Sequence, residues 1–380
     1  MKRTELAAVL AALTLAACND AAGPQDMDPA PAFAAGGGYA GSVYTMSNDA
    51  AANEVLAYRR AADGSLSFQA AFATGGSGSG GGLGNQGGLV LTGNGRTLLV
   101  VNAGSNDISV FRRSNDGTLG LTDREPSGGT LPISVTVRDN AVYVLNAGGA
   151  GGIAGFRLSP QGDLSAVAGS AQPLSSAAPG PAQIEFAPNG RFLVVTEKNT
   201  NQIVVYPVSQ GVAGPGVVNP SQGATPFGFG FDTRGHLLVS NAAGGAADAG
   251  SMSSYRIGNA GNLIGLDTDV PNTESAPCWV VVTRDGRFAY TTNTASGTTS
   301  GYALRPETLT LLDADGVTGT NTGAPIDAAL SRHGGQVFLY VLNGGGAAID
   351  GFAVNHDGSL SPVAGGVVGL PAGTNGLAAS

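Results

Sequence analysis

Residues 89–119 read LVLTGNGRTLLVVNAGSNDISVFRRSNDGTL, and this stretch contains one complete unit of a repeated pattern. An apolar run is followed by a glycine-bearing turn, a second run that closes on Asn102, a third run, and an Asp-Gly turn. The dipeptides Asn94-Gly95 and Asp116-Gly117 are suited to the positive φ angles of tight hairpin turns. The stretch therefore predicts a small antiparallel meander of β-strands.

The same pattern recurs along the chain. The residues that close the second apolar run lie 44 to 54 residues apart, and they are Asn48, Asn102, Asn146, Glu197, Asn241, Asn293 and Asn343. This spacing is typical of a four-stranded propeller blade. No segment of the sequence carries a sustained helical period with caps. We therefore predict an all-β, seven-bladed β-propeller over residues 40–380, with four antiparallel strands in each blade.

The two ends of the repeat region complement each other. The first unit begins at residues 43–46, which match the second strand of a unit, so its innermost strand is missing locally. Residues 375–379 resemble an innermost strand such as residues 87–91. We expect the C-terminal strand to join the first blade and close the ring, which removes open sheet edges.

The composition supports this class and excludes others. Among 380 residues, 62 are glycine, 42% are hydrophobic and 12% are charged. Each glycine costs about 1 kcal/mol in a helix relative to alanine, whereas short strands and turns tolerate it. The recurring apolar runs argue against disorder. A net charge of −9 without a basic stripe argues against nucleic-acid binding.

The N-terminus predicts export. Lys2 and Arg3 precede the apolar residues 6–15, which are too few to span a bilayer and indicate a signal peptide. Residues 15–18, LAAC, resemble the lipobox of bacterial lipoproteins, which implies cleavage after residue 17 and a lipid on Cys18. Residues 18–39 would then form a flexible tether in a protein anchored in the cell envelope, facing the periplasm or the outer surface. The alternative is an ordinary signal peptide with an incidental cysteine.

Strand direction predicts where a ligand could bind. The second strand of each blade returns to the face where the innermost strand begins, so its closing residue lies at the mouth of the central channel. Residues just after the prolines that begin the innermost strands should line the same mouth. The predicted substrate-binding residues are Asn102, Asn146, Gln183, Asn241, Trp279, Asn293, Asp327 and Asn343. The alternative is structural: asparagine caps turns, and tryptophan packs in cores.

Glu197 breaks the asparagine series and is followed by Lys198. A carboxylate at the channel mouth can act as a general base or as a metal ligand. We therefore predict Glu197 and Lys198 as the candidate catalytic residues. The alternative is a solvated ion pair that contributes about 0–1 kcal/mol.

Residues 186–197 (FAPNGRFLVVTE) and 278–293 resemble the seven-bladed lactonase-like propeller family, and the resemblance extends over about residues 40–380. That family includes propeller-type 6-phosphogluconolactonase and fungal 3-carboxy-cis,cis-muconate lactonizing enzyme. The resemblance implies action on lactones of sugar acids or muconates, with a histidine and an arginine after an inner-strand proline and a glutamate closing a second strand. Here the positions after the prolines are Ile133, Ala182, Phe227, Cys278 and Ile326. Only Glu197 matches the implied set.

Three functional hypotheses follow from these residues. The first is a lactonase-like envelope lipoprotein, a hydrolase or lactonizing enzyme that uses Glu197 as general base on a sugar-acid or muconate-type lactone. The second is a non-catalytic propeller that binds a small carbohydrate, a carboxylate or a protein through its asparagine-lined mouth. The third is a calcium-bound propeller hydrolase with Glu197 and neighbouring asparagines as ligands. Apart from this Ca²⁺, no cofactor is expected, and we expect a monomer attached to the membrane through Cys18.

Overall fold

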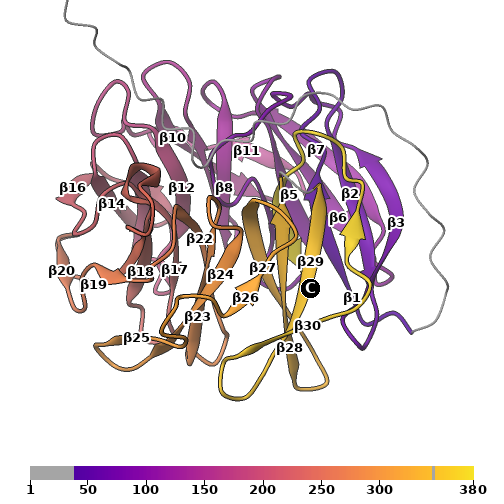
Figure 1. Ribbon diagram of the computed structural model, residues 1–380. Helices are drawn as coiled ribbons and strands as arrows, with labels where there is room; N and C mark the ends of the chain where they lie inside the picture. The colour runs from indigo at the N-terminus through magenta and orange to yellow at the C-terminus, as the bar shows by residue number, and fades with distance from the viewer. Residues whose placement is uncertain (1–37, 345–346) are drawn as a thin grey trace, which may run out of the picture.

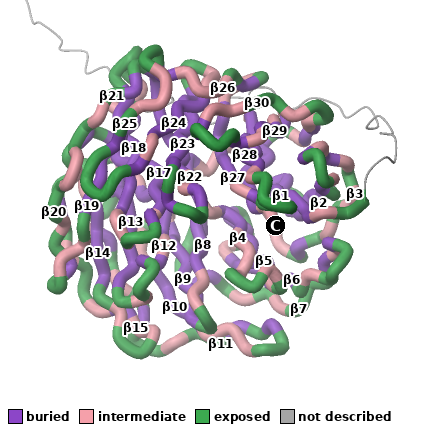
Figure 2. The backbone as a smooth tube through the Cα atoms, turned by 90° about the horizontal axis from the view of Figure 1, so that it is seen from below, coloured by how far each residue is buried: buried purple, intermediate pink, exposed green. Residues whose placement is uncertain are grey.

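A computed structural model describes residues 38–344 and 347–380, which form seven antiparallel sheets arranged in a ring (Figures 1 and 2). The prediction of an all-β, seven-bladed propeller is confirmed. The only helical element in the described part is the short 3-10 turn η1 (Ala243–Gly245). The predicted signal peptide, Cys18 and the tether up to residue 37 lie outside the described residues. Within the described ranges, no helix has the length and apolar character needed to cross a membrane.

Each blade is built around an innermost strand, a second strand and a third strand. The first four blades contain, from the axis outward, β32 (Asn375–Ala379), β1 (Gly41–Met46), β2 (Glu54–Arg60) and β3 (Leu66–Ala73); β4 (Leu89–Leu91), β5 (Thr97–Asn102), β6 (Asp107–Arg113) and β7 (Leu119–Pro126); β8 (Pro132–Arg138), β9 (Ala141–Asn146), β10 (Gly152–Leu158) and β11 (Leu164–Ala166); and β12 (Pro181–Phe186), β13 (Phe192–Glu197), β14 (Gln202–Ser209), β15 (Val212–Ala213) and β16 (Val217–Pro220).

The last three blades follow the same order. They contain β17 (Pro226–Phe231), β18 (Leu237–Asn241), β19 (Ser251–Ile257), β20 (Leu263–Gly265) and β21 (Val270–Pro271); β22 (Pro277–Val282), β23 (Phe288–Asn293), β24 (Thr298–Leu304), β25 (Leu309–Leu311) and β26 (Gly319–Thr320); and β27 (Pro325–His333), β28 (Gln336–Asn343), β29 (Ala348–Val354), β30 (Leu360–Pro362) and β31 (Val367–Val368). In blades 4 to 7, two short strands share the outer position, because both pair with the third strand.

The innermost strands of blades 3 to 7 share a backbone irregularity at their first residues. In blades 3 to 7 the strand begins at a proline, and its register with the second strand shifts directly afterwards. The residue before the proline has a positive φ in four of these blades: Leu131, Gly180, Thr225 and Ala276. A bulge of this kind redirects the next side chains. It therefore sets which residues of the strand face the central channel.

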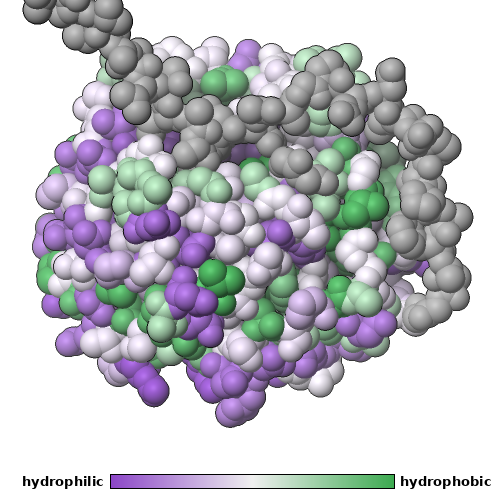
Figure 3. All heavy atoms as spheres, viewed as in Figure 1, coloured by the Kyte–Doolittle hydropathy of each residue, from purple (hydrophilic) through white to green (hydrophobic). Residues whose placement is uncertain are grey.

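Apolar side chains between blades form the core. Each buried cluster combines residues of at least two blades, such as Phe192 and Val205 of blade 4 with Phe229 and Tyr255 of blade 5. Figure 2, turned by 90° from Figure 1, shows the innermost strands around the centre and buried backbone beside them. Large exposed apolar side chains lie singly on outer strands, at Phe68, Leu121, Val218, Ile264 and Val368. Hydrophilic and hydrophobic residues accordingly intermix on the side shown in Figure 3.

The ring closes through the chain ends, as the sequence predicts. β32 pairs with β1 in one antiparallel sheet, with Val43 opposite Ala379 and Met46 opposite Asn375. Asp327 of β27 accepts a hydrogen bond from the backbone N–H of Leu377, at 3.0 Å, and so ties blade 7 to the C-terminal strand. Below, the mouth face is the side where the innermost strands begin, and the turn face is the side where they turn into the second strands.

Candidate functional site

The central channel contains a cavity of about 260 Å³ between the innermost strands. Alternate residues of a strand point to the same side, so Gln183 and Glu185 of β12 both face this space, together with Thr136 of β8 and Asp327 of β27. Leu89, Val90, Leu91, Val135, Val137, Ile184, Ala328 and Leu377 are the apolar residues of the lining. A space of this size suits only a small ligand, because pockets for drug-sized molecules span about 300–1,000 Å³.

Burial shifts the pKa values of two carboxyl groups in this cavity upward, which favours their neutral forms. Burial raises the pKa of Glu185 to about 8, although a hydrogen bond from Gln183 opposes the shift. Glu185 is half-buried, and it lines the cavity. Burial likewise raises the pKa of Asp327 well above its usual range, against hydrogen bonds from the backbone N–H groups of Ala328 and Leu377. Neutral carboxyl groups can donate hydrogen bonds inside a pocket.

Gln183 connects two innermost strands. Its side-chain oxygen accepts the backbone N–H of Phe229 at 2.7 Å, and its amide donates to the Phe229 carbonyl at 3.0 Å. The same amide group also donates to Glu185 Oε2 at 3.0 Å. The sequence predicts Gln183 as a substrate-binding residue, and the structure places it on the cavity wall with its donors and acceptor in internal bonds.

A chain segment, Leu83 to Gly88, lies across the mouth of the channel. Gln86 reaches from the start of blade 2 to blade 6, where it accepts the backbone N–H of Val280 at 3.0 Å and donates to the Val280 carbonyl at 2.7 Å. Its own N–H donates to the carbonyl of Ala182 at 3.0 Å. Gly228 leaves room for it, because a Cβ there would collide with the Gln86 side chain. The segment thus links blades 2, 4 and 6 and forms a plug.

Two of the predicted site residues hold this plug. Trp279 is 1% exposed, and its indole N–H donates to the carbonyl of Asn85 at 2.6 Å. Lys198 donates to the carbonyl of Gly84 at 2.5 Å, and its ammonium group lies 4.7 Å from the centroid of the Phe227 ring. Burial lowers the pKa of Lys198 to about 8. Both side chains lie at the mouth, as the sequence predicts, and both contact the chain's own backbone.

Glu197 is fully buried, with an exposed fraction of 0%. Its carboxylate accepts hydrogen bonds from the backbone N–H of Ser175 at 2.9 Å, from the Ser175 hydroxyl, and from the Thr200 hydroxyl at 2.8 Å. It forms no ion pair with Lys198. The carboxylate therefore connects the segment around Ser175 to the end of β13. Both of its oxygens already accept hydrogen bonds from the protein.

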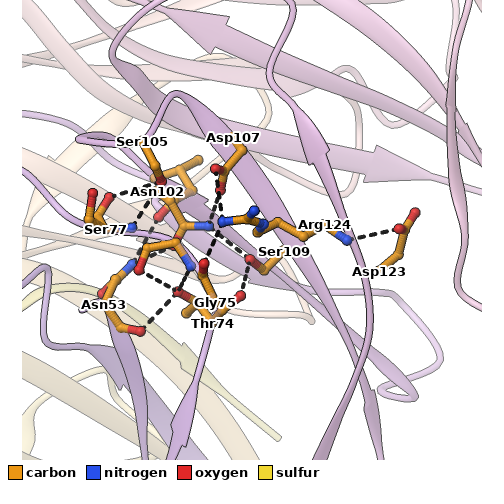
Figure 4. Close-up of polar contacts among 12 residues, drawn as sticks. Asn53, Thr74, Gly75, Ser77, Asn102, Ser105, Asp107, Ser109, Asp123 and Arg124 are labelled. Atoms are coloured by element: carbon orange, nitrogen blue, oxygen red, sulfur yellow. Dashed lines mark hydrogen bonds and ion pairs between the residues drawn. The ribbon is translucent and has the colours of Figure 1, made fainter. Parts of the chain in front are cut away.

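The closing asparagines are buried and bonded within the mouth face. Asn102 is typical: it donates to Asp107 Oδ1 at 2.6 Å and to the Ser109 hydroxyl at 2.8 Å, and it accepts from Asn53 at 2.9 Å (Figure 4). Asn241 and Asn293 donate in the same way to hydroxyl groups of the third strand. Asn146 bonds Ser127, and Asn343 donates to Asp350. These contacts are those of a structural cap, which is the alternative that the sequence leaves open.

The sequence-based reasoning missed Glu185, Asn85 and Gln86. Glu185 carried a usable signal, because an acidic residue in the middle of an innermost strand, two positions after Gln183, must face the channel. Gln86 carried none, since it lies in a glycine-rich stretch that reads as a surface loop. No group of three or more His, Cys, Asp or Glu side chains within residues 38–344 and 347–380 is placed to hold a metal ion.

Comparison with known proteins identifies the type of propeller. A family model described as lactonase, seven-bladed β-propeller, matches residues 153–269. The matched residues lie in blades 3 to 5, and this part of the chain is similar to the lactonase-type propellers. Among curated proteins, none matches the chain.

Solved structures resemble this seven-bladed propeller over nearly its whole length. The periplasmic gluconolactonase of Pseudomonas aeruginosa aligns with a TM-score of 0.66 and 19% identity, covering 88% of this chain and 98% of that one. A Bacteroides uniformis protein, provisionally assigned as a 6-phosphogluconolactonase, aligns with a TM-score of 0.70 and 16% identity, covering 90% of this chain and 99% of that one. At such identities the likeness establishes the fold.

Proposed function

We propose that the protein hydrolyses a small lactone of the sugar-acid type in the bacterial cell envelope, with the channel cavity as its active site. The two carboxyl groups of the channel cavity, Glu185 and Asp327, carry the proposal, because shifted pKa values of groups that line a pocket are typical of catalytic residues. The family match and the lactonase-type relatives support the class of substrate. The envelope location rests on the signal peptide and the lipid expected on Cys18.

Lactone hydrolysis needs a base that activates water and a donor for the oxygen that gains negative charge. Glu185 suits the first role, because a pKa of about 8 lies close to the working pH and leaves a strong base once the proton is lost. Asp327 suits the second role: its oxygens accept two backbone N–H groups, and in its neutral form it keeps one O–H to donate. In this mechanism water adds to the ring carbonyl, the ring oxygen leaves, and the proton taken by Glu185 passes to it.

Glu197, the base predicted from the sequence, is the competing candidate. Its three hydrogen bonds would have to be exchanged for a water molecule before it could act. Purified protein should therefore be assayed against gluconolactones and simple lactones, with Glu185→Gln and Glu197→Gln in parallel. We expect Glu185→Gln to lower kcat/KM at least 100-fold, with activity of the unmodified protein rising with pH toward 8. Loss of activity in Glu197→Gln alone, with unchanged thermal stability, would return the catalytic role to Glu197.

A non-catalytic binding propeller is the second candidate function. The observation that favours it over catalysis is that Glu197 and Lys198 are held in internal hydrogen bonds. The closing asparagines are bonded internally too, so the ligand would occupy the channel cavity. If no lactone is hydrolysed while a sugar acid raises the melting temperature, the protein is a binding protein and the catalytic proposal is wrong. An EDTA arm tests the calcium hypothesis, because activity that is lost in EDTA and restored by Ca²⁺ requires a bound metal.

A further inference from the structure

A second cavity, of about 600 Å³, opens on the turn face, away from the plug. It lies where blades 1, 2, 6 and 7 meet around the end of the channel. Its walls come from the turn between β4 and β5, the turn between β22 and β23, and the end of β27, together with the chain segments at Tyr39 and Ser380. Leu91 lines both this pocket and the channel cavity, so the two spaces adjoin.

Among the described residues, three arginines line this pocket and no Asp or Glu side chain does. They are Arg113, Arg284 and Arg332. None of the three forms an ion pair within the described residues. Arg284 and Arg332 are exposed at the rim. This concentration of positive charge contrasts with the net charge of −9 of the chain. A concave site lined by charges of one sign attracts ligands of the opposite sign.

Arg113 is oriented by its neighbours. Its Nε donates to the Tyr44 hydroxyl at 2.9 Å, and its terminal nitrogens donate to the Ser380 hydroxyl at 3.0 Å and to the Gly95 carbonyl at 3.4 Å. All of these acceptors are neutral, so they fix the guanidinium without offsetting its charge. A further bond to the Tyr39 hydroxyl completes this set, so Arg113 contributes a fixed positive charge to the pocket wall.

A fourth guanidinium lies beneath the pocket wall. Arg60 is fully buried, with an exposed fraction of 0%, and it donates to the backbone oxygens of Ala40 at 2.6 Å and Ser380 at 3.2 Å. Its Nε has no hydrogen-bond acceptor within the described part of the chain. Gly41, in the wall, is in direct contact with it, because a Cβ there would meet the guanidinium. A carboxylate at Ser380 would offset one of the four positive charges.

We propose that this pocket binds a small organic anion with two or more negative charges, either a phosphate monoester or a di- or tricarboxylate. Buried or clustered positive charges are costly unless a counter-charge accompanies them. Guanidinium groups recognise both kinds of anion through paired hydrogen bonds. The site is separate from the proposed active site, because it lies on the turn face and includes neither Glu185 nor Asp327.

Isothermal titration of the full-length protein with citrate and, separately, with inorganic phosphate tests the proposal. We expect saturable binding of at least one probe, weakened tenfold or more in the double variant Arg284→Gln with Arg332→Gln. The matched control is Arg256→Gln with Arg305→Gln, which removes two exposed arginines of blades 5 and 6. This control should change the affinity less than twofold. Binding of citrate alone identifies a carboxylate site, and binding of phosphate identifies a phosphate site.

Two outcomes overturn the proposal: neither probe binds, or the control pair weakens binding as much as the pocket pair. Thermal unfolding without ligand checks that both double variants are folded. Glu185→Gln should bind the probe as the unmodified protein does, so a failure of the lactonase assay leaves this test intact. Conversely, a protein that hydrolyses lactones but binds neither anion would refute the proposed anion site and leave the proposed function standing.

Discussion

Glu185 illustrates how a single residue acquires its chemistry from its neighbours. In the sequence it is one acidic residue among the 27 Asp and Glu residues of the chain. In the structure it faces the channel cavity with Gln183 as its hydrogen-bond donor, and none of the described residues that line this cavity is cationic. Charge on a carboxylate is poorly solvated in such surroundings. The residue therefore keeps its proton near neutral pH.

This environment predicts a pH dependence of stability. An unfolded Glu loses its proton near pH 4.3, whereas folded Glu185 keeps it to about pH 8. Between these values the folded state binds the extra proton, so its contribution is complete at low pH and is lost as the pH rises through 8. We expect the unfolding free energy to fall by up to about 1.4 kcal/mol per pH unit over this window from this group.

Urea unfolding of the unmodified protein and Glu185→Gln at pH 5, 6.5 and 8 measures the effect. The variant should lose less stability between pH 5 and 8 than the unmodified protein. Glu307→Gln, which changes an exposed carboxylate, serves as the control and should follow the unmodified protein. Equal pH slopes for Glu185→Gln and the unmodified protein would contradict the raised pKa.

At the scale of elements, the plug from Leu83 to Gly88 changes what the propeller mouth can do. A meander repeat by itself leaves the start of the channel open. Here Gln86 pairs with both backbone groups of Val280 as a neighbouring strand would. A loop segment thereby supplies hydrogen bonds inside a ring whose opposite blades cannot reach each other.

We expect Gln86→Ala to lower the unfolding free energy by about 1–3 kcal/mol, because the N–H and carbonyl of Val280 would lose buried partners. Thermal or urea unfolding gives the value. Gln161→Ala, at an exposed turn, should change stability by less than about 0.5 kcal/mol. If the two variants are equally stable, the plug contributes nothing to the fold and its placement across the mouth is incorrect.

At the scale of the whole molecule, tyrosines of the second strands connect each of four blades to the next. The hydroxyl of Tyr340 in blade 7 donates to the carbonyl of Gly64 in blade 1 at 2.7 Å, and Tyr290 makes the same bond to Gly358 one blade earlier. Tyr44 and Tyr143 repeat the contact at two other junctions. The Tyr340 bond crosses the point where the two chain ends meet, so it reports on ring closure.

Removing this hydroxyl with Tyr340→Phe should lower the unfolding free energy by about 1 kcal/mol, with the ring still closed by β32. Urea unfolding measures the change. Tyr58→Phe is the matched control, because Tyr58 is nearly buried but its hydroxyl has no hydrogen-bond partner among the described residues. A loss in Tyr58→Phe as large as that in Tyr340→Phe would show that the inter-blade bond is not the cause.

The repeat spacing, the hairpin dipeptides and the complementary ends determined the seven-bladed ring and its closure from sequence alone. They could do so because turn chemistry and strand periodicity act between near neighbours, and each unit repeats them. The sequence also placed Gln183, Trp279, Lys198 and Asp327 around the channel. It could not show that Trp279 and Lys198 bind the plug segment, or that the Glu197 carboxylate is occupied by internal hydrogen bonds. It also could not show that Glu185 lines the channel cavity and that three arginines line the pocket on the turn face. Those facts depend on contacts between residues far apart in the sequence, such as Gln86 and Val280, 194 positions apart, and Arg113 and Ser380, 267 positions apart, and only the closed ring brings such residues together.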